Sequence, residues 1–140
     1  MESDKTVITV TTKVNAPVET VWQVWTSPEH IVQWNNASED WHTPKAENDL
    51  QVGGAFVYTM AARDGSMSFD FGGVYDEVVP HEVIAYTIAD GRKVWIEFAE
   101  VEGQTLVKES FEAESTHSVE MQQAGWQAIL DNFKNYVENN

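Results

Sequence analysis

The chain has 140 residues, of which 42% are hydrophobic, and this is typical of one folded domain with a substantial core. Its 8 Lys and Arg stand against 23 Asp and Glu, and the resulting net charge of −15 repels phosphate backbones and anionic lipid heads. The absence of cysteine excludes disulfides and thiolate chemistry, and the absence of a basic stripe argues against nucleic-acid and membrane partners.

The sequence shows no targeting or membrane-spanning segment. No apolar run approaches the roughly 20 residues that cross a bilayer. The first residues, Met1 to Lys5, lack the basic region and the apolar segment of a signal peptide. With no repeats and no linkers, we expect a single domain over residues 1–140, located in the cytoplasm.

The first third of the chain predicts one strand and two short helices. Residues 6–14 are rich in Val, Ile and Thr, as strands are. Asn15-Ala16-Pro17 then starts a helix, because proline suits the first helical turn, and apolar residues follow at helical spacing in residues 18–25. Ser27-Pro28-Glu29 repeats this start signal, so a second short helix follows and carries Trp34.

From residue 41 the pattern changes to that of strands. Residues 41–49 are polar and irregular, with room for one short strand. Further strands are expected at residues 56–60, 68–79, 83–89, 94–101 and 105–113. The pairs Asp64-Gly65, Asp90-Gly91 and Glu102-Gly103 lie between them and favour tight turns. The strands therefore form a meander of antiparallel hairpins.

The last segment, residues 118–140, predicts one long amphipathic helix. Ser118 is a suitable N-cap, and Glu120 lies in the first turn, where the helix dipole favours a negative charge. The large apolar residues of this helix fall within an arc of about 120°: Val119, Trp126, Ile129, Leu130, Phe133, Tyr136 and Val137. A twisted antiparallel sheet also has one face that needs cover. We therefore expect an α+β fold, in which a curved antiparallel sheet surrounds the C-terminal helix and the two short helices close one end.

Several short motifs resemble a known family in their order and spacing. They are Asn15-Ala16-Pro17 with Trp22, Pro28-Glu29-His30 with Trp34, Gly53-Gly54, Gly73-Val74-Tyr75 before Val79-Pro80, and Gly125-Trp126. Together they resemble the helix-grip superfamily (START-like, Bet v 1-like, SRPBCC), and within it the AHSA1-like branch related to the C-terminal domain of the activator of Hsp90 ATPase. The resemblance covers nearly the whole chain. It implies a cavity between sheet and long helix that commonly holds an apolar or amphipathic small molecule.

Motifs for metal, nucleotide or nucleophilic chemistry are missing from the sequence. Its four histidines, His30, His42, His81 and His117, are isolated and show no ligand spacing, so we expect no metal site. No P-loop and no Gly-x-Ser-x-Gly elbow occurs. We therefore expect no cofactor and no catalytic residues, which favours a protein that is not an enzyme.

The rings of six Trp, six Phe and four Tyr are the main candidates for a binding site. Core packing under the helix explains any single ring, but ligand pockets are also mostly apolar with a few placed polar groups. We expect Trp34 and Trp41 at the mouth of the cavity, and Trp126 beside Gly125 on the helix. The predicted floor comprises Phe56, Tyr58, Phe69, Phe71 and Tyr75, with Met60 on the same face.

Two polar residues occupy positions where the pattern calls for apolar ones, and they are the predicted polar contacts of the cavity. Gln122 lies inside the apolar stripe of the last helix, and Glu109 shares strand parity with Val107 and Phe111. An inward carboxylate must be paired, hydrogen-bonded or protonated, because desolvating it alone is too costly. The alternative is that Glu109 faces water or pairs with Lys93 or Lys108.

Three functions are compatible with this sequence. The leading hypothesis is a domain that binds a small apolar or amphipathic ligand, and a cavity that holds such a ligand would favour it. The second is a protein-interaction module similar to an Hsp90 co-chaperone, with a chaperone as partner, which an exposed apolar patch over a filled core would favour. The third is a small cyclase or hydrolase, which converging titratable groups in a pocket would favour.

Overall fold

The computed structural model describes residues 6–36, 39–88, 91–114 and 118–139. Its elements are β1 (Val7–Val14), α1 (Val18–Thr26), α2 (Pro28–Trp34), β2 (Trp41–Asn48), β3 (Ala55–Ala62), β4 (Ser68–Val79), β5 (Val83–Ile88), β6 (Lys93–Val101), β7 (Gln104–Glu112) and α3 (Val119–Glu138). The predicted order of one strand, two short helices, a run of strands and a long helix is confirmed.

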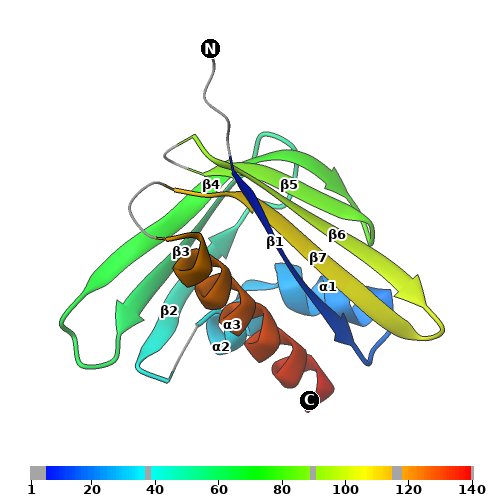
Figure 1. Ribbon diagram of the computed structural model, residues 1–140, viewed down its shortest axis with the longest axis horizontal. Helices are drawn as coiled ribbons and strands as arrows, with labels where there is room; N and C mark the ends of the chain where they lie inside the picture. Colours follow the sequence, from blue (N-terminus) through cyan, green and yellow to red (C-terminus); the bar gives the residue numbers. More distant parts are fainter. Residues whose placement is uncertain (1–5, 37–38, 89–90, 115–117, 140) are drawn as a thin grey trace.

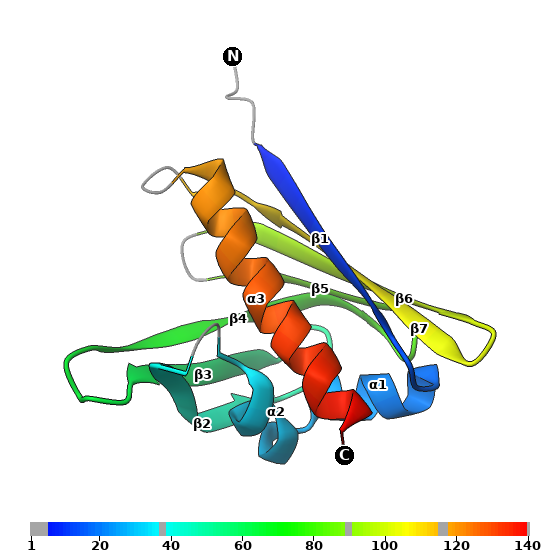
Figure 2. The same ribbon diagram turned by 60° about the horizontal axis from the view of Figure 1, so that its bottom comes forward.

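The seven strands form one antiparallel sheet in the order β1-β7-β6-β5-β4-β3-β2. Strands β2 to β7 follow one another as a meander, and β1 returns to pair with β7. The sheet curls so that β1, β6 and β7 rise on one side of α3 and β2, β3 and β4 on the other (Figure 1). The short helices α1 and α2 lie at the end of the sheet where α3 finishes (Figure 2). The helix-grip fold expected from the sequence is therefore the observed one.

The main departure from the sequence prediction is β2, which is a full strand of eight residues. It lies at the edge of the sheet and pairs only with β3, so it needs fewer apolar residues than a central strand. Its register shifts between His42 and Lys45, around Pro44, which has no N–H to donate to the ladder. The proline and the polar side chains made this strand look irregular in the sequence.

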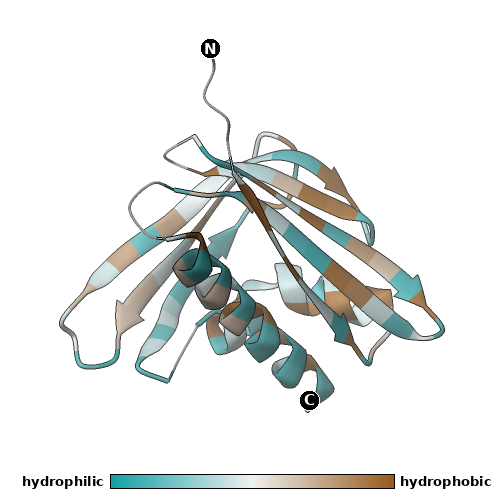
Figure 3. Ribbon diagram, viewed as in Figure 1, coloured by the Kyte–Doolittle hydropathy of each residue, from teal (hydrophilic) through white to brown (hydrophobic). Residues whose placement is uncertain are grey.

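Helix α3 presents its apolar stripe to the concave face of the sheet. The side chain of Ser118 accepts a hydrogen bond of 3.1 Å from the backbone N–H of Met121, so the predicted N-cap is confirmed. Leu130, Phe133 and Val137 are buried, whereas Val119 is 42% exposed. Of the apolar residues in the predicted stripe, the first that packs against the core is therefore Trp126, about two turns after Val119. Along the strands, apolar and polar residues follow one another in bands (Figure 3). In β1, β6 and β7 the buried and the more exposed positions largely alternate, as expected for strands with one face on the core.

Two glycines show how the backbone constrains the sheet. The two-residue connection between β6 and β7 has positive φ at Glu102 (56°) and Gly103 (82°), as a type I′ hairpin turn requires. In β4, a Cβ added at Gly73 would lie 2.4 Å from the carbonyl oxygen of Thr87 on β5. No side chain fits there, so Gly73 permits a close approach of β4 and β5.

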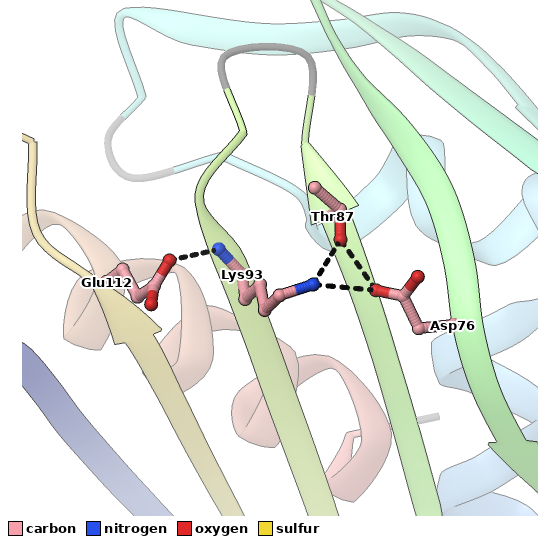
Figure 4. Close-up of polar contacts among 4 residues, drawn as sticks. All are labelled: Asp76, Thr87, Lys93 and Glu112. Atoms are coloured by element: carbon pink, nitrogen blue, oxygen red, sulfur yellow. Dashed lines mark hydrogen bonds and ion pairs between the residues drawn. The ribbon is translucent and has the colours of Figure 1, made fainter.

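A polar network ties four strands together at one end of the sheet (Figure 4). The hydroxyl of Thr87 donates to Asp76 Oδ2 at 2.6 Å. Lys93 Nζ donates to Thr87 Oγ1 at 3.1 Å and lies 3.8 Å from Asp76 Oδ2. The backbone N–H of Lys93 donates to Glu112 Oε1 at 2.8 Å. Since the ion pair is about half-exposed, we expect it to contribute no more than about 1 kcal/mol.

In the part of the chain that the structure describes, no helix combines the length and the apolar character needed to cross a membrane.

Replacing Phe133 by alanine should test the central role of α3. Its fully buried ring lies 4.8 Å from the rings of both Trp25 and Trp34, so Phe133→Ala should lower the free energy of unfolding by about 3–5 kcal/mol. Gln123→Ala, at an exposed position of the same helix, should change it by no more than about 0.5 kcal/mol. Urea denaturation of both variants measures the difference, and a loss below about 1 kcal/mol for Phe133→Ala would contradict the packing described here.

Candidate functional site: a ring-walled cavity

A cavity of about 210 Å³ lies between the concave face of the sheet and α3. The sheet supplies one wall, α3 supplies the opposite wall with Trp126 and Ile129, and α1 and α2 close one end with Trp25 and Trp34. Most of the lining side chains are aromatic rings. Phe69 also lines the cavity and is 47% exposed, so the cavity reaches the solvent beside it.

The register of the sheet brings the rings of its wall together. Tyr58 on β3 lies directly opposite Phe71 on β4, and Tyr75 on β4 lies directly opposite Tyr86 on β5. Residues directly opposite on neighbouring strands point to the same face, so all four rings point toward α3. Trp126 of α3 faces them, with its ring centroid 6.2 Å from that of Phe71.

The hydroxyls at this wall form a chain of hydrogen bonds. Tyr58 hydrogen-bonds to Tyr75, whose hydroxyl donates to Asn48 Oδ1 at 2.6 Å, and Asn48 Nδ2 donates to the carbonyl oxygen of Thr26 at 2.7 Å. Burial raises the pKa of Tyr75 to about 12 and raises the pKa values of Tyr58 and Tyr86 well above their ordinary range. The three phenols therefore stay protonated at neutral pH and act as hydrogen-bond donors.

Among the described residues that line the cavity, Glu109 alone carries a carboxyl group. Its residue is 7% exposed, and its neighbours directly across the sheet are Val10 on β1 and Ile96 on β6. Within the described part of the chain no hydrogen-bond donor reaches its carboxyl group. Burial raises the pKa of Glu109 from its ordinary value of 4.5 to about 8, so the empty cavity holds the protonated acid at neutral pH.

The partners that the sequence offered for Glu109 lie elsewhere. Lys93 Nζ binds Thr87 and Asp76 in the polar network at the end of the sheet (Figure 4). Lys108 is exposed and precedes Glu109 on β7, so its side chain points to the opposite face. Of the two alternatives left open by the sequence, the structure therefore shows an inward Glu109 that faces the cavity.

Comparison with known proteins agrees with this architecture. The profile of the family described as activator of Hsp90 ATPase homolog 1-like protein matches residues 15–138. The chain belongs to this family. A comparison with functionally curated proteins gives no match.

Solved structures of AHSA1-like proteins and related chains share the whole fold. An AHSA1-like protein from Aeromonas hydrophila is 46% identical, with a TM-score of 0.90 over 96% of this chain and 93% of that one. A protein from Cytophaga hutchinsonii is 54% identical, with a TM-score of 0.80 over 99% and 94% of the two chains. A protein from Chromobacterium violaceum is 26% identical, with a TM-score of 0.85 over 96% and 99%.

Seven of the ten residues that the sequence proposed for the AHSA1-like cavity line it in the structure. They are Trp34, Tyr58, Phe69, Phe71, Tyr75, Glu109 and Trp126. Alternation along the strands and the apolar stripe of the last helix placed most of them, because both patterns state which face a side chain occupies.

The other three proposed residues lie outside the lining. Phe56 is 2% exposed, and its ring is covered by those of Tyr58, Tyr75 and Tyr86 at 5.1, 5.3 and 4.6 Å. Trp41 is half-buried on the edge strand, where its ring lies 5.9 Å from that of Phe69. Strand parity gives the face of a residue but not its depth, so these positions could not be separated by pattern.

Gln122, the third residue outside the lining, has a structural role. Its Nε2 donates to the carbonyl oxygen of Glu114 at 3.0 Å, and its Oε1 accepts from the backbone N–H of Glu114 at 2.9 Å. The amide thus fastens the first turns of α3 to the chain that follows β7. A polar residue inside an apolar stripe is satisfied here by backbone groups and not by a ligand.

Met60, which the sequence placed on the same floor as Tyr58, also lines the cavity, whereas five lining residues were not proposed from the sequence: Trp25, Asn35, Ile84, Tyr86 and Ile129. Most of them belong to apolar faces of predicted helices or strands. The sequence does not show which part of such a face borders a cavity. Asn35 gave no signal. It follows α2, is buried, and its Nδ2 donates to Thr43 Oγ1 at 3.3 Å.

Among residues 6–36, 39–88, 91–114 and 118–139, no three His, Asp or Glu side chains are grouped so that they could hold a metal ion.

The raised pKa of Glu109 predicts how stability depends on pH. Between pH 4.5 and 8 the unfolded chain has released the proton of Glu109 while the folded chain retains it, so folding stability falls as pH rises through this window. Since one pKa unit corresponds to about 1.4 kcal/mol, the loss reaches roughly 5 kcal/mol by pH 8. Glu109→Gln removes this titration. As pH rises from 4.5 to 8, the free energy of unfolding of this variant should therefore increase relative to that of the wild type by up to the same amount.

Urea unfolding of the wild type and Glu109→Gln between pH 4 and 8.5 measures this effect. Glu97→Gln makes the same change of charge at an exposed position of β6 and should run parallel to the wild type. Parallel curves for the wild type and Glu109→Gln would show that Glu109 titrates in the fold as it does in the unfolded chain.

Proposed function

We propose that this AHSA1-like protein binds a small, predominantly apolar molecule in the cavity between the sheet and α3. The observation that carries the proposal is the cavity of about 210 Å³ between the sheet and α3. An engineered cavity of about 150 Å³ lined by Leu, Ile and Phe stays dry and binds benzene. The larger, ring-walled cavity of this protein is therefore suited to a ligand somewhat larger than benzene.

The opening and the polar groups of the cavity fit such a ligand. The exposed ring of Phe69, in contact with Trp41, marks an entry from solvent. Inside, Glu109 and the hydroxyls of Tyr58 and Tyr86 supply a few polar contacts in an apolar surface, which is the usual composition of small-molecule sites. The resemblance to the helix-grip superfamily supports the same function.

A role as a protein-interaction module has less support from the surface. The most exposed large apolar side chains, at Val52, Met67, Val101 and Met121, lie in different turns and element ends. Met67 is in the β3–β4 hairpin and Val101 at the β6–β7 hairpin, and these hairpins lie at opposite ends of the molecule (Figure 1). A docking surface is instead expected to gather such residues in one patch.

Acid–base catalysis is a second candidate, favoured by the capacity of Glu109 to exchange a proton near neutral pH. The phenols around it stay protonated, since burial raises the pKa of Tyr75 to about 12 and the pKa values of Tyr58 and Tyr86 well above their ordinary range. A single titrating group is a weak basis for catalysis. The recovery of a bound compound unchanged after long incubation favours binding, and its conversion by the wild type but not by Glu109→Gln favours catalysis.

Filling the cavity should abolish binding. Ile129 lines the cavity from α3, so Ile129→Trp should weaken the binding of indole, a neutral ring compound, by about tenfold or more. Gln123→Trp makes the same side chain at an exposed position of α3 and should leave the affinity unchanged. Isothermal titration calorimetry gives the affinities, and circular dichroism checks that both variants are folded. Failure of the wild type to bind indole or a set of similar ring compounds would overturn the proposed function.

A further inference from the structure

We propose that the cavity takes a ligand with a cationic amine, whose ammonium group pairs with Glu109 while its apolar part packs against the rings. The inference rests on the proposed function and names the chemical class of the ligand for the same site.

Glu109 is a lining residue whose carboxyl group no protein donor satisfies, and the hydroxyl of Tyr86 likewise has no partner among the described residues. The hydroxyls of Tyr58 and Tyr75 belong to the hydrogen-bond chain that ends at Asn48, and Asn35 donates to Thr43. By contrast, no donor in the described part of the chain reaches the carboxyl group of Glu109, although this residue is only 7% exposed. A buried acid without a partner is costly, and a ligand that donates charged hydrogen bonds to it removes that cost.

The walls of the cavity suit a cation as well as an apolar group. A cation over the face of Trp, Tyr or Phe is attracted by the ring quadrupole, and aromatic cages recognise ammonium groups in this way. The rings are also held in place. Trp126 stacks on Phe111 with centroids 3.8 Å apart, and Trp34 Nε1 donates to the carbonyl oxygen of Val24 at 3.0 Å. A cage that is already formed loses little conformational freedom on binding.

Of the lining residues that the structure describes, none has a cationic side chain that could compete for Glu109. The neighbouring strands β1 and β6 place Val10 and Ile96 beside it, and α3 presents Trp126. The titratable groups that face the same space are the phenols of Tyr58 on β3, Tyr75 on β4 and Tyr86 on β5, which carry no charge at neutral pH. A ligand ammonium therefore meets no competing cation among these described residues.

The charge of the whole chain also favours a cationic ligand. Its net charge of −15 raises the local concentration of cations and disfavours anions. Near the opening, exposed Glu39 and Asp40 precede Trp41, whose ring contacts Phe69. Arg63 lies in the same region, with Nε donating to the carbonyl oxygen of Glu39.

The protonation state of Glu109 gives this pairing a distinctive dependence on pH. Below pH 8 the empty site holds the protonated acid, so an ammonium ligand must displace one proton to solvent when it binds. Affinity for the amine should rise about tenfold per pH unit between pH 5 and 7 and level off above pH 8. A neutral ligand of the same shape releases no proton and should show no such rise.

The test compares benzylamine, benzyl alcohol and benzoate, which share a ring and differ in charge, by isothermal titration calorimetry of the full chain at pH 6, 7 and 8. We expect benzylamine to bind more tightly than benzyl alcohol at pH 8, with affinity that rises with pH and with proton release at pH 6. Glu109→Gln should lose this preference and its pH dependence while it still binds benzyl alcohol. Glu97→Gln, which makes the same charge change on the outer part of β6, should behave as the wild type does.

The outcomes separate this inference from the proposed function. If benzyl alcohol binds as tightly as benzylamine, or if the preference for benzylamine survives in Glu109→Gln, the inference is overturned while the proposed function stands. Tighter binding of benzyl alcohol that weakens above pH 8 also overturns it, because Glu109 would then act as a neutral donor. If none of the three compounds and no neutral ring compound binds, the proposed function itself fails.

Discussion

The structure depends on covering a wide curved sheet with one narrow helix. Neighbouring strands lie about 4.8 Å apart and a helix with its side chains is only about 10 Å wide, so α3 cannot cover the concave face of seven strands by itself. Leu130, Phe133 and Val137 close the core along the last half of α3. Nearer the start of α3, rings from β3, β4 and β5 line the concave face. The cavity is the space left between these rings and the side chains of Trp126 and Ile129.

Glu109 is an acidic residue on the buried face of β7, and its position lowers the stability of the fold. Thr105, Val107 and Phe111 share its face of β7 and are fully buried, so an apolar residue at position 109 would complete the core. The buried carboxyl instead lowers stability above pH 4.5, as its raised pKa implies. Positions that break a local rule without a structural gain are where functional sites are expected.

Sequence patterns predicted the fold better than the site. Residues 68–79 and 119–138 have long, regular patterns, and both became the elements expected, whereas β2 was obscured by Pro44 and by its edge position. Strand parity placed Tyr58, Phe71 and Phe56 on the same inner face. Only Tyr58 and Phe71 of these three line the cavity, because the ring of Phe56 lies beneath those of its neighbours. Burial depth, and the location of a void, arise from the meeting of elements that are distant in sequence. For the same reason the sequence left the orientation of the Glu109 side chain open. It could be decided only once the positions of Lys93 and α3 were known.

The persistence of the cavity follows from how its rings are held. A void with flexible aliphatic walls can shrink by small shifts of side chains, and the energetic cost of such a void depends on how far its walls relax. Here the indole of Trp34 is fixed by its hydrogen bond to Val24, Tyr75 by its bond to Asn48, and Trp126 by stacking on Phe111. Relaxation would break these contacts, so the space remains open before any ligand arrives. The side chains of the site thus lose their conformational entropy during folding. Less of the interaction free energy with a ligand is then offset when the ligand binds.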